Sequence, residues 1–412
     1  MPNFIINNFN FSYPNNLFLL TGFIINIFII FNSWKKIKEK KSLYLFITII
    51  YFFSSALVIS SNNWLIFIAG WELVTLTTAL ILLWDNKSTA WEYFLVQFLG
   101  GSFLILTVLI AYTNGYQNLA PISEFWLQLM FIISVGIKSA LIFFHIWLPY
   151  IYKRASSTFC ALSSAWVAKL GYITMLKIIS QGNRILLYIG MIMIFYGGIK
   201  ALEEKNYKLI LAYSSISQFG FITIAIGSGN IYGYTGAILH IIAHAFAKTV
   251  LFNGASNWIK EFNSTSIFDF KNCFNRQKIN AFSTTLAFLS LMAFPFFIGY
   301  NSKHLIKYSL NSIPMFVFLL HLGSILTVGY SVKILWVIIF KDIEKNDLKL
   351  KNNTKINYKL NIYENLSLIV PAVSLIFLAL SVNIYLNENF DFHYLSGIFI
   401  TLIYLAVAYL IR

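Results

Sequence analysis

Residues 64–84 read WLIFIAGWELVTLTTALILLW, an apolar run with one charged side chain, Glu72, near its middle. A bilayer core about 30 Å thick is crossed by roughly 20 consecutive apolar residues in a helix. Such runs follow one another along most of the 412 residues, of which 58% are hydrophobic and 11% charged. Soluble domains contain about 25% charged residues, so the composition predicts an α-helical membrane protein.

About thirteen crossings are expected, all within one integral membrane domain that covers residues 1–412. The spans are predicted at 16–33, 42–60, 64–84, 91–112, 124–148, 157–179, 184–200, 208–227, 232–257, 279–299, 314–340, 364–386 and 394–411. Lysine and arginine gather in every second loop, such as 34–41 and 341–359, whereas loops such as 60–63 carry no charge. Basic loops stay on the inner side of a membrane, so we expect an outer N-terminus and an inner C-terminus. The net charge of +15 therefore indicates topology rather than nucleic-acid binding.

A few ionisable side chains lie inside or beside these spans, where each costs about 2.5–3.5 kcal/mol at the membrane centre. Such residues usually mark a transport pathway or a buried ion pair. The span 314–340 contains Lys333, and Lys303 lies either inside the membrane or at its edge. The remaining candidates are Glu72, Lys138, Lys169, His240, His244 and Lys248.

Two patterns among these residues suit proton transfer. Glu72 is the one carboxylate deep inside a predicted span, and making or breaking its pairing with a buried lysine would shift the proton affinity of that lysine. The alternative is a static ion pair that holds helices together. His240, His244 and Lys248 are spaced i, i+4, i+8 on one helix face, which predicts a proton relay. A polar packing seam or a metal site at the two histidines is the alternative there.

Two spans are expected to be interrupted. The segment 138–149 reads KSALIFFHIWLP, and the segment 294–303 reads FPFFIGYNSK, so each combines a lysine with helix-breaking residues. Non-helical backbone at membrane depth is tolerated where it is buried in protein or lines a wet cavity. Transporters place ion sites at such breaks, so both segments are expected near the pathway.

Four stretches of the sequence resemble the antiporter-like membrane subunits shared by respiratory complex I, Mrp-type cation/proton antiporters and membrane-bound hydrogenases. They are Gly70-Trp71-Glu72, the run from Lys138 through His145-Ile146-Trp147-Leu148-Pro149 to Ala168-Lys169-Leu170-Gly171, the stretch Leu211-Ala212-Tyr213-Ser214-Ser215-Ile216-Ser217-Gln218, and His240-x-x-x-His244-x-x-x-Lys248. They follow one another in the family's order. One departure is that Pro149 precedes a proline-free basic segment, 150–158, where the family shows an acidic residue and a Thr-Pro stretch.

The resemblance implies an all-α polytopic helical bundle with inverted repeats, a family-like core at about 62–340, and an N-terminus about two helices short. It implies that Glu72 pairs with Lys138 and that changes in this pairing drive protons onward. The relay would be Lys169, His240, His244 and Lys248, with Lys303 as the terminal lysine.

The expected function is that of a proton-translocating subunit of a membrane redox complex of the NADH:quinone oxidoreductase type, without a redox site or cofactor of its own. The alternative of the same fold is a subunit of an Mrp-type monovalent cation/proton antiporter, which would move Na+ as well as protons. A haem carrier using His240 and His244, and a scaffold without transport, are further alternatives. Expected partners are other membrane subunits and the lipid bilayer, in a bacterial or mitochondrial inner membrane.

Overall fold

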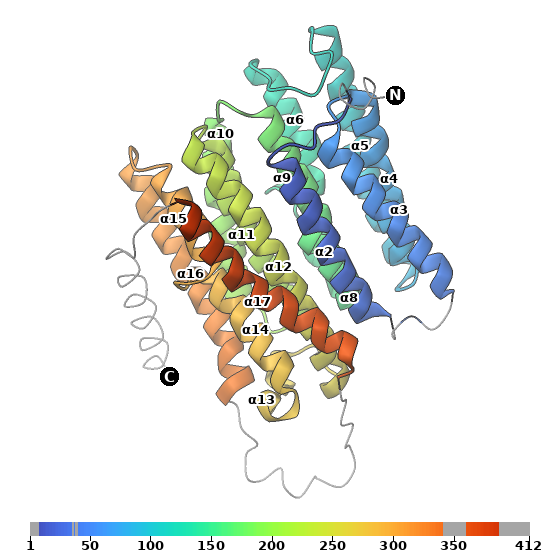
Figure 1. Cartoon of the computed structure of the whole chain (residues 1–412), viewed down its shortest axis with the longest axis vertical. Helices are drawn as coiled ribbons and strands as arrows, with labels where there is room; N and C mark the ends of the chain where they lie inside the picture. The colour runs from blue at the N-terminus through green and yellow to red at the C-terminus, as the bar shows by residue number, and fades with distance from the viewer. Residues whose placement is uncertain (1–7, 35–36, 38–39, 341–359, 387–412) are drawn as a thin grey trace, which may run out of the picture.

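The computed structural model describes residues 8–34, 37, 40–340 and 360–386, and this part of the chain is a bundle of membrane-length helices (Figure 1). Ten helical segments of the described chain are long and apolar enough to cross a membrane. Two further crossings are made by pairs of shorter helices on either side of a break. Twelve of the predicted spans therefore correspond to helices, and the span 394–411 lies outside the described residues.

Most helices follow the predicted spans closely, but the two interrupted crossings extend to Arg154 and Tyr308 instead of 148 and 299. In chain order they are α2 (Asn15–Ser33), α3 (Lys41–Ser60), α4 (Trp64–Leu82), α5 (Lys87–Thr113), α6 (Phe125–Lys138), α7 (Trp147–Arg154), α8 (Ser157–Leu162), the π-helix η1 (Ser163–Val167), α9 (Ala168–Ile178), α10 (Arg184–Glu203), α11 (Tyr207–Gly227), α12 (Ile231–Phe262), the 3-10 turn η2 (Ile267–Asp269), α13 (Cys273–Arg276), α14 (Lys278–Leu291), α15 (Ile298–Tyr308), α16 (Pro314–Phe340) and α17 (Ile362–Leu386). Asparagine N-caps begin many of them: the Asn63 side chain, for example, accepts from two amides at the start of α4.

Both predicted interruptions are confirmed. The first lies between α6 and α7, and the second between α14 and α15. Each contains two non-glycine residues with positive φ, three positions apart: Ala140 and Phe143 in the first, Ala293 and Phe296 in the second. A left-handed residue cannot continue a right-handed helix, so these positions end the regular hydrogen bonding.

The two breaks share one backbone pattern and lie in the fifth and tenth of the predicted crossings. Crossings separated by an odd number run in opposite directions through the membrane. The matching pattern on antiparallel segments is what an inverted repeat produces, in agreement with the expected fold class.

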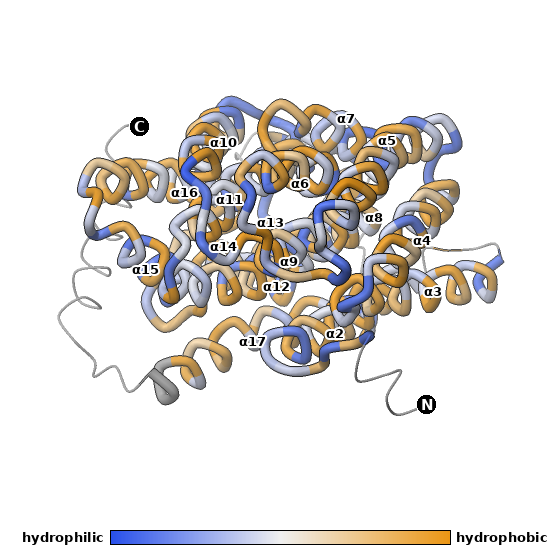
Figure 2. Tube along the Cα trace, turned by 90° about the horizontal axis from the view of Figure 1, so that it is seen from above, coloured by the Kyte–Doolittle hydropathy of each residue, from blue (hydrophilic) through white to orange (hydrophobic). Residues whose placement is uncertain are grey.

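The central helices are polar inside and enclosed by protein, whereas the outer helices face lipid. The segment α8–η1–α9 and the helices α11 and α12 are almost wholly buried within the bundle. Outer helix α5 instead exposes Leu99 and Leu109. Helix α17 crosses obliquely over α12 and α14 and reaches α2 (Figure 1). Viewed from above, hydrophilic residues collect mainly at the loops and helix ends (Figure 2).

Candidate functional site

Lys138, the last residue of α6, has its ammonium group against α4. Its Nζ donates to the Thr75 hydroxyl at 2.8 Å and to the Trp71 carbonyl at 3.4 Å, and it lies 4.5 Å from the centre of the Trp71 ring. The lysine is 1% exposed. A hydroxyl, a carbonyl and an aromatic face together stabilise a cation without a formal counter-charge.

Glu72 lies next to this group, but among the described residues it forms no ion pair with Lys138. Its carboxylate points at α5, where a methyl group added to Gly101 would come within 1.9 Å of Oε1. The two charges are nevertheless close enough to interact. The expected pairing is not formed here, and it stays a prediction.

Lys169 begins the next part of the site, directly after the π-helix η1. Its Nζ donates to the carbonyl of Ser164, which the π-helical turn leaves available. Lys169 connects to the Lys138 region through the following turn of α9, because the Tyr172 hydroxyl donates to the Ser139 carbonyl at 3.1 Å. A wide helical turn beside a buried lysine is typical of functional positions.

His240, His244 and Lys248 lie on one buried face of α12, as the spacing predicts. The two imidazole rings are 6.4 Å apart and inclined by 21°. The Nδ1 atom of His240 shares a hydrogen bond of 2.9 Å with the Ser302 hydroxyl, and Lys248 Nζ donates to the Ser214 hydroxyl at 2.6 Å. Each of the three side chains is at most 1% exposed.

Lys303 is also buried, at 1% exposure, so it does not snorkel to the membrane surface. It belongs to α15, after the second break, and its Nζ donates at 2.9 Å to the carbonyl of Leu291, the last residue of α14. Its ammonium also lies 4.4 Å from the centre of the Phe221 ring. Carbonyls at a helix C-terminus carry partial negative charge and attract a cation.

Two phenylalanines of α11 each contact one of the lysines and one of the histidines. Phe219 is 5.2 Å from Lys169 Nζ and 5.1 Å from the His244 ring centre. Phe221 likewise contacts Lys303 Nζ, and its ring centre lies 5.9 Å from that of His240. The structure thus brings Lys169, Lys303 and the α12 residues His240, His244 and Lys248 together around α11, and the Tyr172 hydrogen bond joins this group to the region of Lys138 and Glu72. These seven residues are called the row below.

Thr75, Ser214, Ser302 and the two phenylalanines are site residues that the sequence interpretation missed. Two of them had a sequence signal, because Ser214 lies in the family-like stretch 211–218 and Ser302 directly precedes a candidate lysine. Nothing in the sequence singles out the other three. The hydroxyl partners and aromatic contacts depend on which helices are neighbours, and this becomes visible only in the fold.

Other lysines hold helix ends together instead of joining the row. Lys333, expected at mid-span, donates to the carbonyls of Leu202 and Glu204 and so caps α10. Lys208 caps α7 through the Ala155 carbonyl at 2.8 Å. Lysines near a helix C-terminus satisfy its free carbonyls, which gives these residues a structural role.

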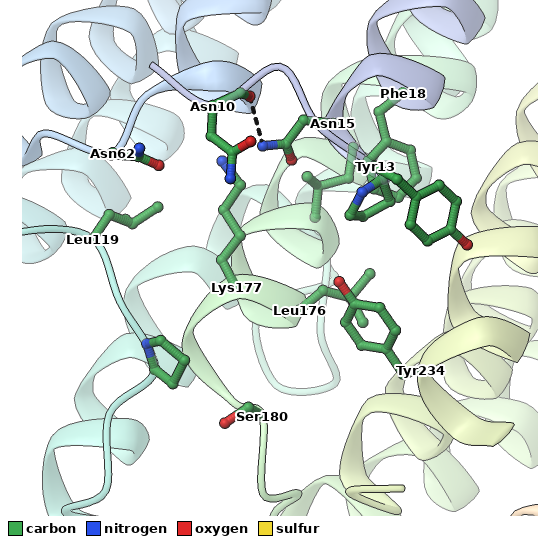
Figure 3. Close-up of a pocket in the computed structure, with 13 residues that line it drawn as sticks. Asn10, Tyr13, Asn15, Phe18, Asn62, Leu119, Leu176, Lys177, Ser180 and Tyr234 are labelled. Carbon is green, nitrogen blue, oxygen red and sulfur yellow. Dashed lines mark hydrogen bonds between the residues drawn. The ribbon is translucent and has the colours of Figure 1, made fainter. Parts of the chain in front are cut away.

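Lys177 makes a similar cap on α3, through the carbonyl of Ile59, and lies in a pocket of about 400 Å³ at the N-terminal end of the bundle. Figure 3 shows its side chain pointing toward Asn10, with Leu176 and Tyr234 on another side of the pocket. The row itself does not reach this pocket.

No cluster of three or more histidine, cysteine, aspartate or glutamate side chains suited to a metal ion occurs in the described part of the chain. His240 and His244 also project from the same helix, and His240 is engaged by Ser302. A haem held by two histidines needs one ligand on each of its faces, so this pair is poorly placed for that role.

Comparison with known proteins gives consistent matches. The sequence profile of the family described as NADH:quinone oxidoreductase/Mrp antiporter, TM, matches residues 61–328. The chain is 27% identical to NADH-ubiquinone oxidoreductase chain 5 of Hypocrea jecorina over 84% of its own length and 54% of that protein. It is 26% identical to a Staphylococcus aureus protein whose name describes an antiporter subunit, mnhA2, over 88% of its length and 50% of that protein. The chain thus spans about half the length of these relatives.

Two solved structures share the fold. One chain of respiratory complex I from Thermus thermophilus superposes with a TM-score of 0.77 at 18% identity, covering 91% of this chain and 85% of that one. A chain of the membrane-bound sulfane sulfur reductase, an archaeal respiratory membrane complex, gives 0.78 at 20% identity, over 90% and 66%. At these identities the likeness establishes the arrangement of helices.

Proposed function

The chain belongs to the family of NADH:quinone oxidoreductase/Mrp antiporter transmembrane proteins, and from this premise we propose that it translocates protons as a subunit of a membrane redox complex. The observation that carries the proposal is the row of buried lysines and histidines between the two helix breaks. Within the described chain, Lys138, Lys169, Lys248 and Lys303 make hydrogen bonds to carbonyls and hydroxyls rather than ion pairs. A group held this way can gain or lose a proton without breaking a salt bridge.

The chemistry is a sequence of proton transfers between nitrogen atoms. When the Glu72 carboxylate turns toward Lys138, the ammonium form is favoured and the lysine takes up a proton. When the carboxylate turns away, the burial of Lys138 favours release toward Lys169. Between the lysines and the histidines that share Phe219 and Phe221 as neighbours, no direct hydrogen bond is formed in the described chain, so that a transfer there requires water or a side-chain movement.

The partners we propose are other membrane subunits that carry the redox chemistry, and the membrane is a bacterial or mitochondrial inner membrane. The chain is a multi-pass membrane protein. The alternation of basic and uncharged loops supports an outer N-terminus and an inner C-terminus. Cysteine labelling from each side of sealed vesicles would test that orientation.

The decisive experiment measures proton flux per assembled complex in reconstituted vesicles. Lys138→Ala should abolish flux while assembly is retained, because it removes the nitrogen whose protonation Glu72 is proposed to control. Lys333→Ala, which removes a half-buried lysine outside the row, is the control and should pump normally per assembled complex. Normal pumping by Lys138→Ala would contradict the proposed function.

The second candidate is a monovalent cation/proton antiporter subunit, favoured by the similarity to the S. aureus protein. The two candidates differ in what drives proton movement. Co-purification in mild detergent separates them, since redox subunits would support the first and other antiporter subunits the second. A flux that responds to a Na+ gradient, without an electron donor, would also favour the antiporter.

A further inference from the structure

The interface between α4 and α5 continues the polar interior away from the row. Two contacts fix how these antiparallel helices align. Gly101 of α5 lies against the Glu72 carboxylate, and the Tyr93 hydroxyl of α5 lies 3.2 Å from the Thr78 hydroxyl of α4. Tyr93 and Gly101 are two helical turns apart on one face of α5.

Gln97 lies between these two contacts, one turn from each. On α4 the residue midway between Glu72 and Thr78 is Thr75, so Gln97 is at the level of the hydroxyl that accepts from Lys138. Gln97 is 1% exposed, and neither its Oε1 nor its Nε2 has a hydrogen-bond partner among the described residues. Buried amides are almost always satisfied, which indicates that this one serves a bound water or the lysine itself.

On the other side of Tyr93 the interface reaches a pocket. The Tyr93 ring packs edge-on against Phe159 at 5.4 Å, and Phe159 lines a cavity of about 470 Å³. Asp85, after the end of α4, and Ser156, before α8, also line it, and the Asp85 carboxylate accepts from the Ser156 amide at 2.8 Å. The Tyr93 side chain therefore contacts a residue of the cavity wall.

A third buried hydroxyl, that of Tyr51, also lies between the cavity and the α4–α5 interface. Tyr51 of α3 is fully buried, its hydroxyl has no hydrogen-bond partner in the described chain, and it lies near Tyr93. Two turns earlier on the same face of α3, Tyr44 lines the cavity. Polar side chains from three helices thus extend from the cavity toward Lys138.

We propose that Thr78, Tyr93 and Gln97 form a proton uptake path from this cavity to Lys138, with Gln97 as the positioning residue that holds the last donor beside the ammonium group. This inference rests on the proposed function and adds the route by which Lys138 is loaded. The Thr78 hydroxyl donates to the Val74 carbonyl at 2.6 Å, so it must turn from that carbonyl before it passes a proton on. Because a hydroxyl accepts one proton while it donates another, a proton can then pass along Tyr93 and Thr78 with no residue left charged. The Gln97 amide does not titrate. Its oxygen and nitrogen orient the hydroxyl or bound water that protonates the neutral Lys138 amine.

The test compares three variants of the full chain in its complex, reconstituted in vesicles. Gln97→Met keeps volume and removes both polar atoms, and Tyr93→Phe removes one oxygen. Tyr207→Phe is the control, since its hydroxyl is also buried and unpartnered among the described residues but belongs to α11, away from the cavity. We expect flux per assembled complex to fall about tenfold in Gln97→Met and about threefold in Tyr93→Phe, with Tyr207→Phe unchanged.

The pH profile distinguishes an uptake path from helix packing. If proton arrival becomes limiting, flux through Gln97→Met should rise as the pH on the uptake side falls, more steeply than in the unmodified protein. Unchanged flux in Gln97→Met and Tyr93→Phe, or an equal loss at every pH, would overturn the path. If Gln97→Met does not assemble, Tyr93→Phe and Thr78→Val decide by the same profile. Loss of flux in Lys138→Ala with normal flux in these variants would refute the path alone, whereas normal flux in Lys138→Ala would refute the proposed function.

Discussion

The two helix breaks have the same backbone and different chemistry. At the first, Lys138 ends the helix before the break, and Glu72 lies beside it. At the second, Lys303 belongs to the helix after the break, and its neighbours are Ser302 and His240 rather than a carboxylate. Each ammonium group nevertheless has one main-chain carbonyl and one aromatic face as partners.

Aligning the two pairs of positive-φ residues shows how the positions of the two lysines differ. If Ala140 corresponds to Ala293, then Lys138 corresponds to Leu291, and Lys303 corresponds to Tyr150. The lysines are therefore not equivalent positions of the repeat. Lys303 Nζ, however, donates to the carbonyl of Leu291 itself. The second half thus also places an ammonium group at its break, but the lysine belongs to the helix after the break rather than to the helix before it.

Both halves of the repeat therefore place an ammonium group at the helix break, although the two lysines come from different positions of the repeat. A broken helix exposes carbonyls at one end and amides at the other, which is a ready site for an ion. The first half adds a carboxylate that can switch the lysine. The second half adds an imidazole that can exchange a proton with it. The first site is thereby suited to controlling the protonation of its lysine, and the second to passing a proton between its lysine and the imidazole.

The largest expected effect tests whether both breaks carry protons. Lys303→Met should lower proton flux at least about a hundredfold, as Lys138→Ala does, because it removes the titratable nitrogen and keeps the side-chain length. Lys307→Met is the control, on the same helix and outside the row. Flux per assembled complex is the measurement, and normal flux through Lys303→Met would mean that the second break has only a structural role.

A smaller effect is expected from the carboxylate that only the first break possesses. Glu72→Gln keeps shape and hydrogen bonding but cannot bias the charge of Lys138, so flux should fall about tenfold or more. Glu124→Gln, a carboxylate in the 114–124 loop, is the control. If Glu72→Gln retains full flux, Glu72 is a packing partner and the two breaks are chemically alike.

The histidines between the breaks should respond next. His240→Gln and His244→Gln retain hydrogen bonding without titrating near neutral pH, so a relay loses rate while stability changes by less than about 1.5 kcal/mol. The double variant should be barely slower than the slower single variant, because residues of one path act as a unit. Flux and thermal stability are measured together. Destabilised proteins that pump normally per folded molecule would identify a packing seam instead.

The sequence predicted both breaks, but for reasons that the structure refines. Pro149 suggested the first interruption, yet it lies in the first turn of α7, where proline is tolerated. The break itself is formed by residues before it, including Ala140 and Phe143, whose left-handed conformation no residue type announces. Pro295 does lie inside the second break.

The buried charges were predictable because charged residues are rare in apolar spans, but their roles were not. Lys333 was predicted inside a span and Lys303 either inside the membrane or at its edge, and the fold shows that the first caps a helix whereas the second belongs to the row. The π-helix before Lys169 had no sequence signal either. Which carbonyl an ammonium group reaches depends on helix packing, and packing is set by contacts between distant parts of the chain.

The smallest expected effect tests the shared backbone of the two breaks. A left-handed conformation costs a residue other than glycine about 1–2 kcal/mol, whereas glycine in a helix interior costs about 0.5–1 kcal/mol relative to alanine. Ala140→Gly and Ala293→Gly should therefore be close to neutral, since relief of strain offsets the lost methyl group and the added chain entropy. Ala225→Gly, a buried control inside α11, should be less stable than either by about 1–2 kcal/mol. The thermal midpoint in detergent is the measurement, and an equal loss in all three variants would contradict the left-handed geometry at both breaks.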